Sequence, residues 1–317
     1  SFRMHIPPYT IVDGGNDLLW EQFSETIRIM KWTSHDNRIL CCIPDGSFLG
    51  AVVWNEFDEM AWIGIIMIFF YWQSLPHLGM YLCVPSVQGF GIGSKIWKRA
   101  MERIDASGRI LGLRGVPSMA AKYAANDTPY EISRLRYNIM SCMEIRELCK
   151  KLKCVQQGSQ VTLKSELTAE QIDELLKFDQ LMTGRDRRDI LIPFLASPAF
   201  ECAVLLNDEG KICGWAAITS VGLESERLFK LAPVYASSSA QFAHLTESLL
   251  PFCESFSTEA KLVVQILSGT VGERKLKPLL SNPQNIERVT LFSEKIEWKM
   301  QKEFCFSPHN TCCHFDG

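Results

Sequence analysis

Three glycines at alternate positions, Gly89, Gly91 and Gly93, stand between an apolar stretch ending at Val84 and a helical pattern that continues to Arg103. Glycine adopts positive φ angles readily and lets a ligand approach the backbone closely. The start of the following helix would add N–H groups and the positive end of the helix dipole, which together suit a phosphate. The spacing is neither the Gly-x-Gly-x-x-Gly of dinucleotide-binding loops nor the Gly-Lys-Ser/Thr of P-loops. The segment therefore predicts a phosphate-binding turn of another kind.

The run Gln88–Gly93 resembles the Gln/Arg-x-x-Gly-x-Gly/Ala loop of the GNAT acyltransferase superfamily. In that family the loop joins the fourth strand to the third helix and holds the pyrophosphate of acetyl-CoA. The resemblance implies that the pyrophosphate is bound by Gln88, Gly89, Phe90, Gly91, Ile92, Gly93 and Ser94. It also implies backbone pairing of Cys83 and Val84 with the pantetheine amides. The alternative is a glycine-rich turn that binds nothing.

Acyl transfer from a thioester to an amine needs a group that takes the proton of the amine and a donor to the leaving thiolate. The resemblance to the GNAT superfamily implies that Val116–Tyr123 is the fourth helix, and that Tyr123 stands at the position of a tyrosine general acid. Its phenol, with a pKa of about 10, suits protonation of a thiolate. Glu56 is the predicted base, in an acidic cluster with Asp58 and Glu59. A tyrosine packed on the helix surface and an ordinary solvated acidic turn are the alternatives.

The composition narrows the classes of function. The chain has 317 residues and a net charge of −3, which leaves no electrostatic footprint for nucleic acid. Its most apolar run, Ala61–Trp72, is too short for a membrane helix, which needs about 20 residues; its aromatic and β-branched residues favour a buried strand. The 12 cysteines form no C-x-x-C motif and no signal peptide is recognisable, so we expect reduced thiols in the cytoplasm, or also in the nucleus. The C-terminal Cys305–His314 matches no common zinc spacing, so we expect no metal and a frayed end.

Hydrophobic periodicity predicts the same order of elements twice. For the first half, residues 1–142, the pattern gives a helix at 16–31, strands at 39–43, 48–55 and 109–113, the glycine loop with its helix, a helix at 118–125 and a strand near 132–142. For the second half, residues 161–300, a capping box of Thr168 and Gln171 opens a helix to about Met182. Strands at 202–206, 212–220, 228–235 and 261–267 and a helix at 240–256 follow. We therefore predict an α/β (α+β) chain of two tandem GNAT-like domains, each a mixed, mostly antiparallel sheet flanked by helices, with a helix and linker at 143–160 and a Cys/His-containing tail at 301–317.

Three segments depart from this order. The second half has Pro233–Ala240 in place of the glycine loop, which favours a structural or substrate-shaping role over binding of an acyl-CoA. The charged run Thr183–Arg188 is either an arginine site for a carboxylate or phosphate or a solvated connection. Residues Ile65–Gly79 read as an insertion into a strand pair, which would disturb the strand before the glycine loop.

The sequence thus predicts an N-acyltransferase that moves an acetyl group from acetyl-CoA to an amine. A small amine, an amino acid or a protein amino group all remain open as acceptors, and no nucleic-acid or membrane partner is expected. One alternative is an acyl-CoA-binding sensor or scaffold without turnover. Another is a pair of interaction domains in which the glycines only form a turn.

Overall fold

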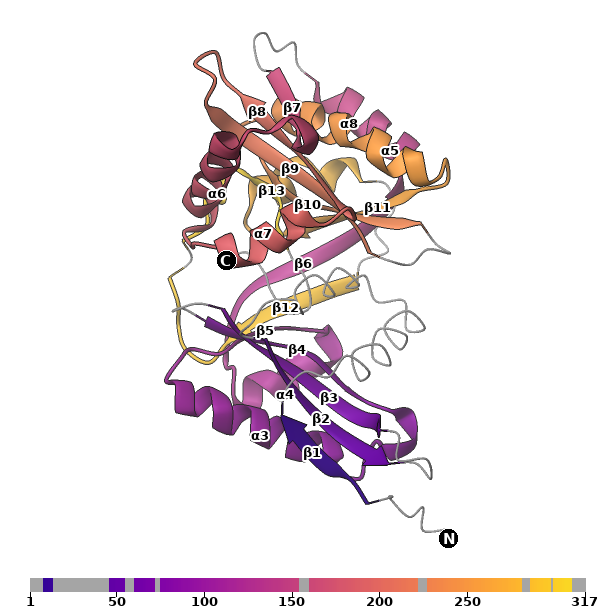
Figure 1. Cartoon of the computed structure of the whole chain (residues 1–317), viewed down its shortest axis with the longest axis vertical. Coiled ribbons are helices and arrows are strands. Elements are labelled where there is room, and N and C mark those ends of the chain that lie inside the picture. The colour runs from indigo at the N-terminus through magenta and orange to yellow at the C-terminus, as the bar shows by residue number, and fades with distance from the viewer. Residues whose placement is uncertain are drawn as a thin grey trace.

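The computed structural model describes residues 8–13, 46–54, 60–71, 75–153, 160–221, 227–280, 286–297 and 299–309. Its described strands join into one continuous sheet that runs through the whole molecule (Figure 1). In the first half the elements are β1 (Thr10–Asp13), β2 (Gly46–Trp54), β3 (Met60–Tyr71), β4 (Leu75–Cys83), α3 (Ile92–Ser107), β5 (Gly112–Gly115), α4 (Pro117–Asn126), β6 (Tyr130–Ser141) and then α5 (Cys142–Leu152).

The second half and the tail repeat the pattern. They contain β7 (Gln160–Leu163), α6 (Ala169–Thr183), α7 (Arg188–Ala196), β8 (Phe200–Leu206), β9 (Ile212–Ser220), β10 (Leu228–Tyr235), α8 (Ser239–Phe256), β11 (Lys261–Leu267), α9 (Val271–Lys275), β12 (Ile286–Phe292) and β13 (Cys305–Ser307). The predicted α/β class is confirmed. The predicted helices and strands of the second half lie within two residues of the observed ones. The predicted helix at 16–31 and strand at 39–43 lie outside the described residues.

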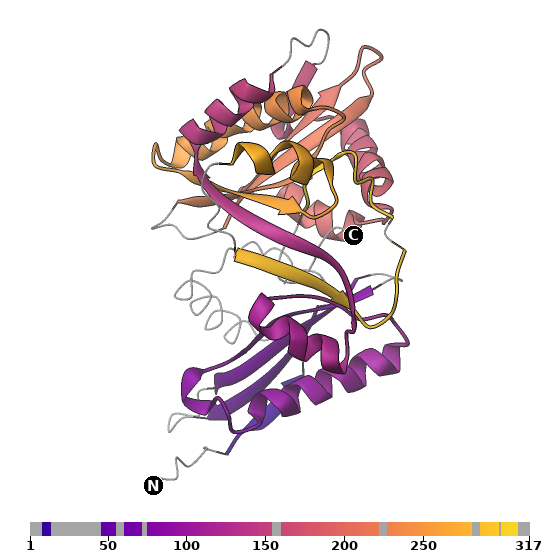
Figure 2. The ribbon, with the colours of Figure 1, turned by 180° about the vertical axis from the view of Figure 1, so that it is seen from behind.

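Strand β12 crosses from the second half into the first. The sheet order is β1-β2-β3-β4-β5-β12-β6-β11-β10-β9-β8-β7, so β12 pairs with both β5 and β6. Strand β6 in turn pairs antiparallel with β11 of the second half. Figure 2 shows β6 and β12 passing side by side through the middle of the molecule. Strand pairing therefore crosses the predicted boundary at residue 142, and the boundaries themselves stay a prediction.

The first-half core lies between α3 and the sheet. Buried Ile92, Ile96, Ala100 and Ile104 line one face of α3 at helical spacing. They pack with Leu111 and Leu113 of the β5 region and with Val289 and Leu291 of β12. The strand contributed by the second half thus supplies part of the core of the first, because its alternate residues face the side of the sheet that α3 and α4 cover.

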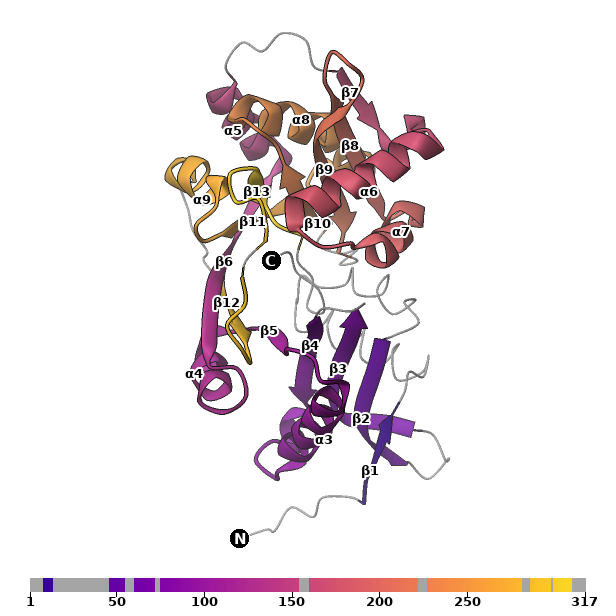
Figure 3. The ribbon, with the colours of Figure 1, turned by 90° about the vertical axis from the view of Figure 1, so that its left-hand side faces the viewer.

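The second half buries both faces of its sheet. Helices α5 and α8 cover one face, and α6 and α7 cover the other (Figure 3). Two features of α6 follow directly from its sequence. Thr168 and Gln171 form the predicted capping box, and Gly184 ends the helix in a left-handed conformation at φ 71°.

Strands β4 and β5 diverge after a short contact. They are parallel partners only at His77–Gly112 and Leu78–Leu113. Beyond that point β4 stays on β3 as far as Cys83, through a bulge in which two residues of β4 oppose one of β3. An opening between β4 and β5 results, at the end of β4 that leads into the glycine loop.

The expected disturbance by residues 65–79 is wrong. Residues 65–71 continue β3 and residues 75–79 begin β4, and the two strands pair from Tyr71–Leu75 to Gly64–Cys83. The apolar run 61–72 is thus mostly strand, as its β-branched and aromatic residues predicted.

The corresponding opening in the second half is closed by the tail. Strands β10 and β11 are parallel partners as far as Leu231–Val264, and β13 pairs with β10 beyond that point, at Val234–Ser307 and Tyr235–Cys305. Phe306 is fully buried, and its ring stacks on Phe242 with centroids 5.0 Å apart. The expectation of a frayed tail is therefore wrong for residues 305–309, because burial of apolar side chains fixes this segment.

Candidate active site

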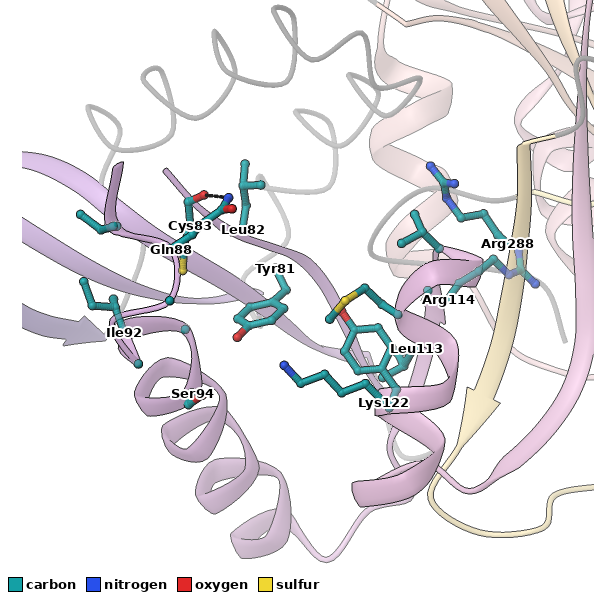
Figure 4. A pocket seen from close by; sticks show the side chains of 18 residues that line it. Tyr81, Leu82, Cys83, Gln88, Ile92, Ser94, Leu113, Arg114, Lys122 and Arg288 are labelled. Carbon is teal, nitrogen blue, oxygen red and sulfur yellow. Dashed lines mark hydrogen bonds between the residues drawn. The ribbon is translucent and has the colours of Figure 1, made fainter. Parts of the chain in front are cut away.

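A cavity of about 640 Å³ occupies the opening between β4 and β5 (Figure 4). One end is formed by the glycine loop and the first turn of α3, and the other by residues of β5 and β12. The described lining consists of Tyr81, Leu82, Cys83, Val87, Gln88, Gly89, Gly91, Ile92, Gly93, Ser94, Leu113, Arg114, Gly115, Val116, Met119, Lys122, Tyr123 and Arg288. The cavity is large enough for a substantial part of a small-molecule ligand.

The glycine loop has the backbone that its sequence predicts. Gly89 and Gly91 have φ angles of 85° and 81°, and no atom lies within 4 Å of where a β-carbon would stand at either. Gly91 is the N-cap of α3, so no side chain occupies the start of the helix. The Gln88 side chain donates a hydrogen bond of 3.0 Å to the carbonyl oxygen of Cys83 and thereby ties the loop to the end of β4. This open helix start with bare backbone suits a phosphate group.

Gly93 has a different role from the other two glycines. A β-carbon at this position would collide with the hydroxyl of Tyr81, and it would stand 3.2 Å from the sulfur of Cys83. Glycine at 93 therefore lets β4 side chains pack directly against the first turn of α3. Burial raises the pKa of the Cys83 thiol, so this thiol remains protonated at neutral pH.

Three aromatic rings form the wall beneath the cavity. The ring of Trp97 stacks on Tyr123 with centroids 5.2 Å apart and meets Tyr81 edge-on at 5.4 Å. The indole N–H donates a 2.7 Å hydrogen bond to Asp127, which fixes the orientation of Trp97. Burial raises the pKa of Tyr81 to about 12 and also raises that of Tyr123 above 10.0. Both phenols are therefore protonated, and able to donate a proton, throughout the neutral range.

Two arginines lie at the far end of the cavity. The Nε of Arg114 on β5 donates a 2.8 Å hydrogen bond to the hydroxyl of Thr290 on β12. Arg288, also on β12, lies over the ring of Tyr137 with its guanidinium carbon 5.7 Å from the centroid. Figure 4 shows both arginines on the side away from Gln88, Ile92 and Ser94, with Tyr81 and Lys122 in between. Together with Lys122, three basic residues and no acidic one line the described part of the cavity.

Most of the residues expected from the sequence come together here. The predicted Cys83, Gln88, Gly89, Gly91, Ile92, Gly93, Ser94 and Tyr123 all line the cavity. Phe90 and Val84 are not among its lining residues: Phe90 is 40% exposed and Val84 packs on the core. Glu56, with Asp58 and Glu59, lies outside the described residues, so its role as base stays a prediction.

Sequence reasoning missed Tyr81, Lys122, Arg114 and Arg288. Tyr81 and Lys122 are sequence neighbours of residues that were identified, and alternation along β4 would have indicated Tyr81 together with Cys83. No local pattern connects Arg288 to a loop some two hundred residues earlier, because only the pairing of β12 with β5 brings it there.

The arginine-rich run Thr183–Arg188 is divided between two roles. Arg187 is buried and makes an ion pair through two nitrogen atoms with the buried Asp179. Arg188 makes a 3.0 Å ion pair with Asp173, and both side chains are exposed.

Across the described residues, no group of three or more His, Cys, Asp or Glu side chains could hold a metal ion. No described helix is both long and apolar enough to cross a bilayer.

Comparisons with known proteins identify the fold. No family model matches the chain. It is 28% identical over 319 residues to an uncharacterized protein of Caenorhabditis elegans, F36G3.2, with 95% of each chain covered. It is 26% identical over 227 residues to holothin acyltransferase of Pseudoalteromonas sp. (strain SANK 73390), covering 70% of this chain and 67% of that one. Among solved structures, a tandem GNAT protein from the clavulanic acid biosynthesis pathway superposes with a TM-score of 0.64 at 12% identity, covering 91% of this chain and all of the other.

The resemblance expected from the glycine loop is thereby confirmed at the level of the fold. The first half combines the diverging β4 and β5, the bulge in β4 and the glycine-capped α3. In the second half β13 pairs with β10 and closes the corresponding opening. The chain has a GNAT fold, as the tandem GNAT protein does.

Proposed function

We propose that the first half transfers an acyl group, in the simplest case acetyl, from acyl-CoA to an amine. The observation that carries this proposal is the open, glycine-capped start of α3 at one end of a cavity between two diverging strands. The relatedness to an acyltransferase and the likeness to a tandem GNAT protein support it.

The geometry of the residues at the start of α3 fits the pyrophosphate of a CoA thioester. A side chain at Gly89 or Gly91 would stand in the space that a pyrophosphate needs, and the positive φ angles there favour glycine. The positive end of the α3 dipole would attract its phosphates, and the amino group of Lys122, which extends from α4 toward α3, would add to this attraction (Figure 4). When bound, the thioester would supply the activated acyl carbon.

The roles of the side chains follow from their proton states. The amine nitrogen would attack the thioester carbon, the C–S bond would break, and the departing sulfur would take a proton from the phenol of Tyr123. Burial keeps this phenol protonated at neutral pH. The proton lost by the amine would pass to a base, for which Glu56 stays our candidate. The products are an amide and CoA with a free thiol.

Thermal unfolding with and without acetyl-CoA tests the proposal. A ligand at one hundred times its Kd that binds only the folded protein adds about 2.7 kcal/mol, which raises Tm by several degrees. We expect this shift in the parent protein and its loss in Gly91→Glu. The control is Gly210→Glu, because Gly210 also has a positive φ, 74°, and no atom within 4 Å of a β-carbon, but lies in the second-half hairpin.

Turnover is then followed with a panel of amines through the release of the CoA thiol. A shift together with thiol release supports the enzyme. A shift without release for any amine would instead indicate a binding protein. No shift in the folded parent, or an equal shift in Gly91→Glu, would contradict the assignment of the loop.

A further inference from the structure

Two buried cysteines meet where α5 packs against α8. Cys142 is the first residue of α5, and Cys253 lies in the last turn of α8. Both belong to the apolar cluster on this face of the sheet; Cys253 is fully buried and Cys142 is 4% exposed. Both are free thiols, and the Cys253 thiol donates a hydrogen bond to the sulfur of Cys142. Two residues far apart in the sequence thus bring their sulfur atoms into contact.

The surroundings of the two thiols fix this contact. The sulfur of Cys142 lies 3.7 Å from the carbonyl oxygen of Ala260, in the connection between α8 and β11. One turn further along α5, Arg146 donates to both carboxylate oxygens of Glu254, at 2.7 and 2.6 Å. Glu254 directly follows Cys253 on α8. Contacts on either side therefore hold the ends of the two helices together, and the sulfur atoms stay adjacent.

The two thiols differ in acidity from each other and from the next cysteine of α5. The hydrogen bond from Cys253 lowers the pKa of the Cys142 thiol and outweighs the burial that opposes it; the charge of Arg146 also lowers this pKa. The same hydrogen bond, together with burial, raises the pKa of Cys253. Burial raises the pKa of Cys149 to about 12. Because the thiolate is the reactive form, Cys142 is the nucleophile and Cys253 the neighbouring thiol that can resolve its oxidised form.

We propose that Cys142 and Cys253 form a redox-sensitive pair, which hydrogen peroxide converts to a disulfide that links α5 to α8. The Cys142 thiolate attacks one oxygen of the peroxide, the O–O bond breaks, and a sulfenic acid and hydroxide form; the hydroxide takes the proton that Cys142 had lost and becomes water. The Cys253 sulfur then attacks the sulfenic sulfur, the S–O bond breaks, and a second water leaves with the Cys253 proton. The two thiols lose two electrons, which the peroxide gains. A small dithiol reverses the reaction by exchange.

The disulfide would change the stability of the protein. It would join the end of β6 to α8, and a cross-link between residues distant in sequence removes conformational freedom from the unfolded chain. We expect the oxidised protein to unfold at a Tm higher by about 5 °C or more, and dithiothreitol to return Tm to its starting value. An unchanged or lowered Tm in the cross-linked protein would contradict a link formed within the native contact.

Peptide mapping tests the link directly. The tryptic peptides 137–146 and 231–261 each contain one of the two cysteines and no other. The folded full chain is treated with a small excess of hydrogen peroxide, its remaining thiols are alkylated in denaturant, and the digest is analysed by mass spectrometry without reduction. We expect these two peptides to appear as one cross-linked species, lighter by two hydrogen atoms than their sum, that dithiothreitol separates.

Cys149 serves as the matched control, because it is fully buried on the same helix. Its peptide, 147–150, is measured in the same digest, and Cys142 should lose its free thiol about tenfold or more faster than Cys149. Cys149→Ala should keep the link. Cys253→Ala should leave Cys142 as a sulfenic acid that dimedone traps, and Cys142→Ala should abolish both the link and the trapped product. The digest of the parent protein decides the question even if a variant folds poorly.

The inference is overturned if both peptides are recovered with alkylated cysteines at a peroxide dose that oxidises other thiols of the folded chain. A link that forms equally fast in urea would overturn it as well, because it would not depend on the contact between α5 and α8. None of these measurements involves acetyl-CoA, so this inference stands or falls independently of the proposed acyl transfer.

Discussion

At the scale of single residues, two tyrosines compete for the role of proton donor. Tyr81 lies against the first turn of α3, where a β-carbon at Gly93 would touch its hydroxyl. Tyr123 lies on α4 beside β5, with its ring 3.0 Å from where a β-carbon of Gly115 would stand. Tyr81 is therefore close to the phosphate end of the cavity, and Tyr123 to the opposite strand. This difference favours Tyr123 as the general acid.

Replacing Tyr123 by phenylalanine tests that role. The ring would keep its stacking on Trp97 and its contact with Gly115, so the fold and the binding of acetyl-CoA should survive. Loss of a general acid typically lowers the rate by 10²–10⁴-fold, and we expect kcat to fall by about 100-fold or more with little change in the KM for acetyl-CoA. Steady-state kinetics measure this effect.

Tyr130→Phe is the control for Tyr123→Phe, because Tyr130 is exposed at the start of β6. The pH profile gives a second check. Burial raises the pKa of Tyr123, and a raised pKa keeps the phenol protonated as pH increases. The alkaline loss of activity that depends on this residue should thus lie above about pH 10. An undiminished kcat in Tyr123→Phe would contradict the assignment.

At the scale of elements, the starts of α3 and α8 are built in opposite ways. Helix α3 begins at a glycine without a side chain. Helix α8 begins at Ser238, whose hydroxyl accepts from the N–H of Gln241, while the Gln241 side chain accepts from both the N–H and the hydroxyl of Ser237. One donor of the first turn of α8, the N–H of Gln241, is thus engaged by the side chain that caps the helix, whereas the start of α3 has no side-chain cap and is open to a ligand.

This contrast predicts one acetyl-CoA per chain. In the second half the start of α8 is capped by side chains and β13 occupies the opening beside β10. Titration calorimetry of the full chain should give a stoichiometry of one, and Gly91→Glu should abolish the heat of binding. A second equivalent of similar affinity, or residual binding by the variant, would show that the second half retains a site.

Local sequence patterns predicted most of these elements but few of their distant contacts. The capping box of Thr168 with Gln171 and the short apolar runs of β8 and β9 are local features, so their signals are complete in the sequence. The same holds for the glycine loop. The burial of His309 and the position of β12 depend on partners far along the chain, and periodicity carries no information about which strand pairs with which.

At the scale of the whole molecule, the first half depends on a strand that it does not contain. Without β12 the core residues beneath α3 would lose Val289 and Leu291, and β5 and β6 would each lose a neighbouring strand. Exposed strand edges of this kind promote aggregation. The site would also lose Arg288.

A fragment of residues 1–153 tests this dependence. Expressed alone it should be poorly soluble or show no thermal shift with acetyl-CoA, because its sheet is incomplete. Co-expression with a fragment of residues 160–317 should restore the shift, since that fragment carries β12. A lone first fragment that binds acetyl-CoA as tightly as the full chain would contradict the requirement.

The position of β12 in the sequence also constrains how the protein is made. The ribosome releases this strand about 150 residues after the end of β6, which is its partner in the sheet. At typical synthesis rates of about 5–20 residues per second, the delay is on the order of ten seconds. During that interval β5 and β6 lack the strand that lies between them in the folded sheet, because β12 has not yet been synthesised. The candidate site in the first half would therefore be among the last parts of this protein to mature, although most of its residues are translated early.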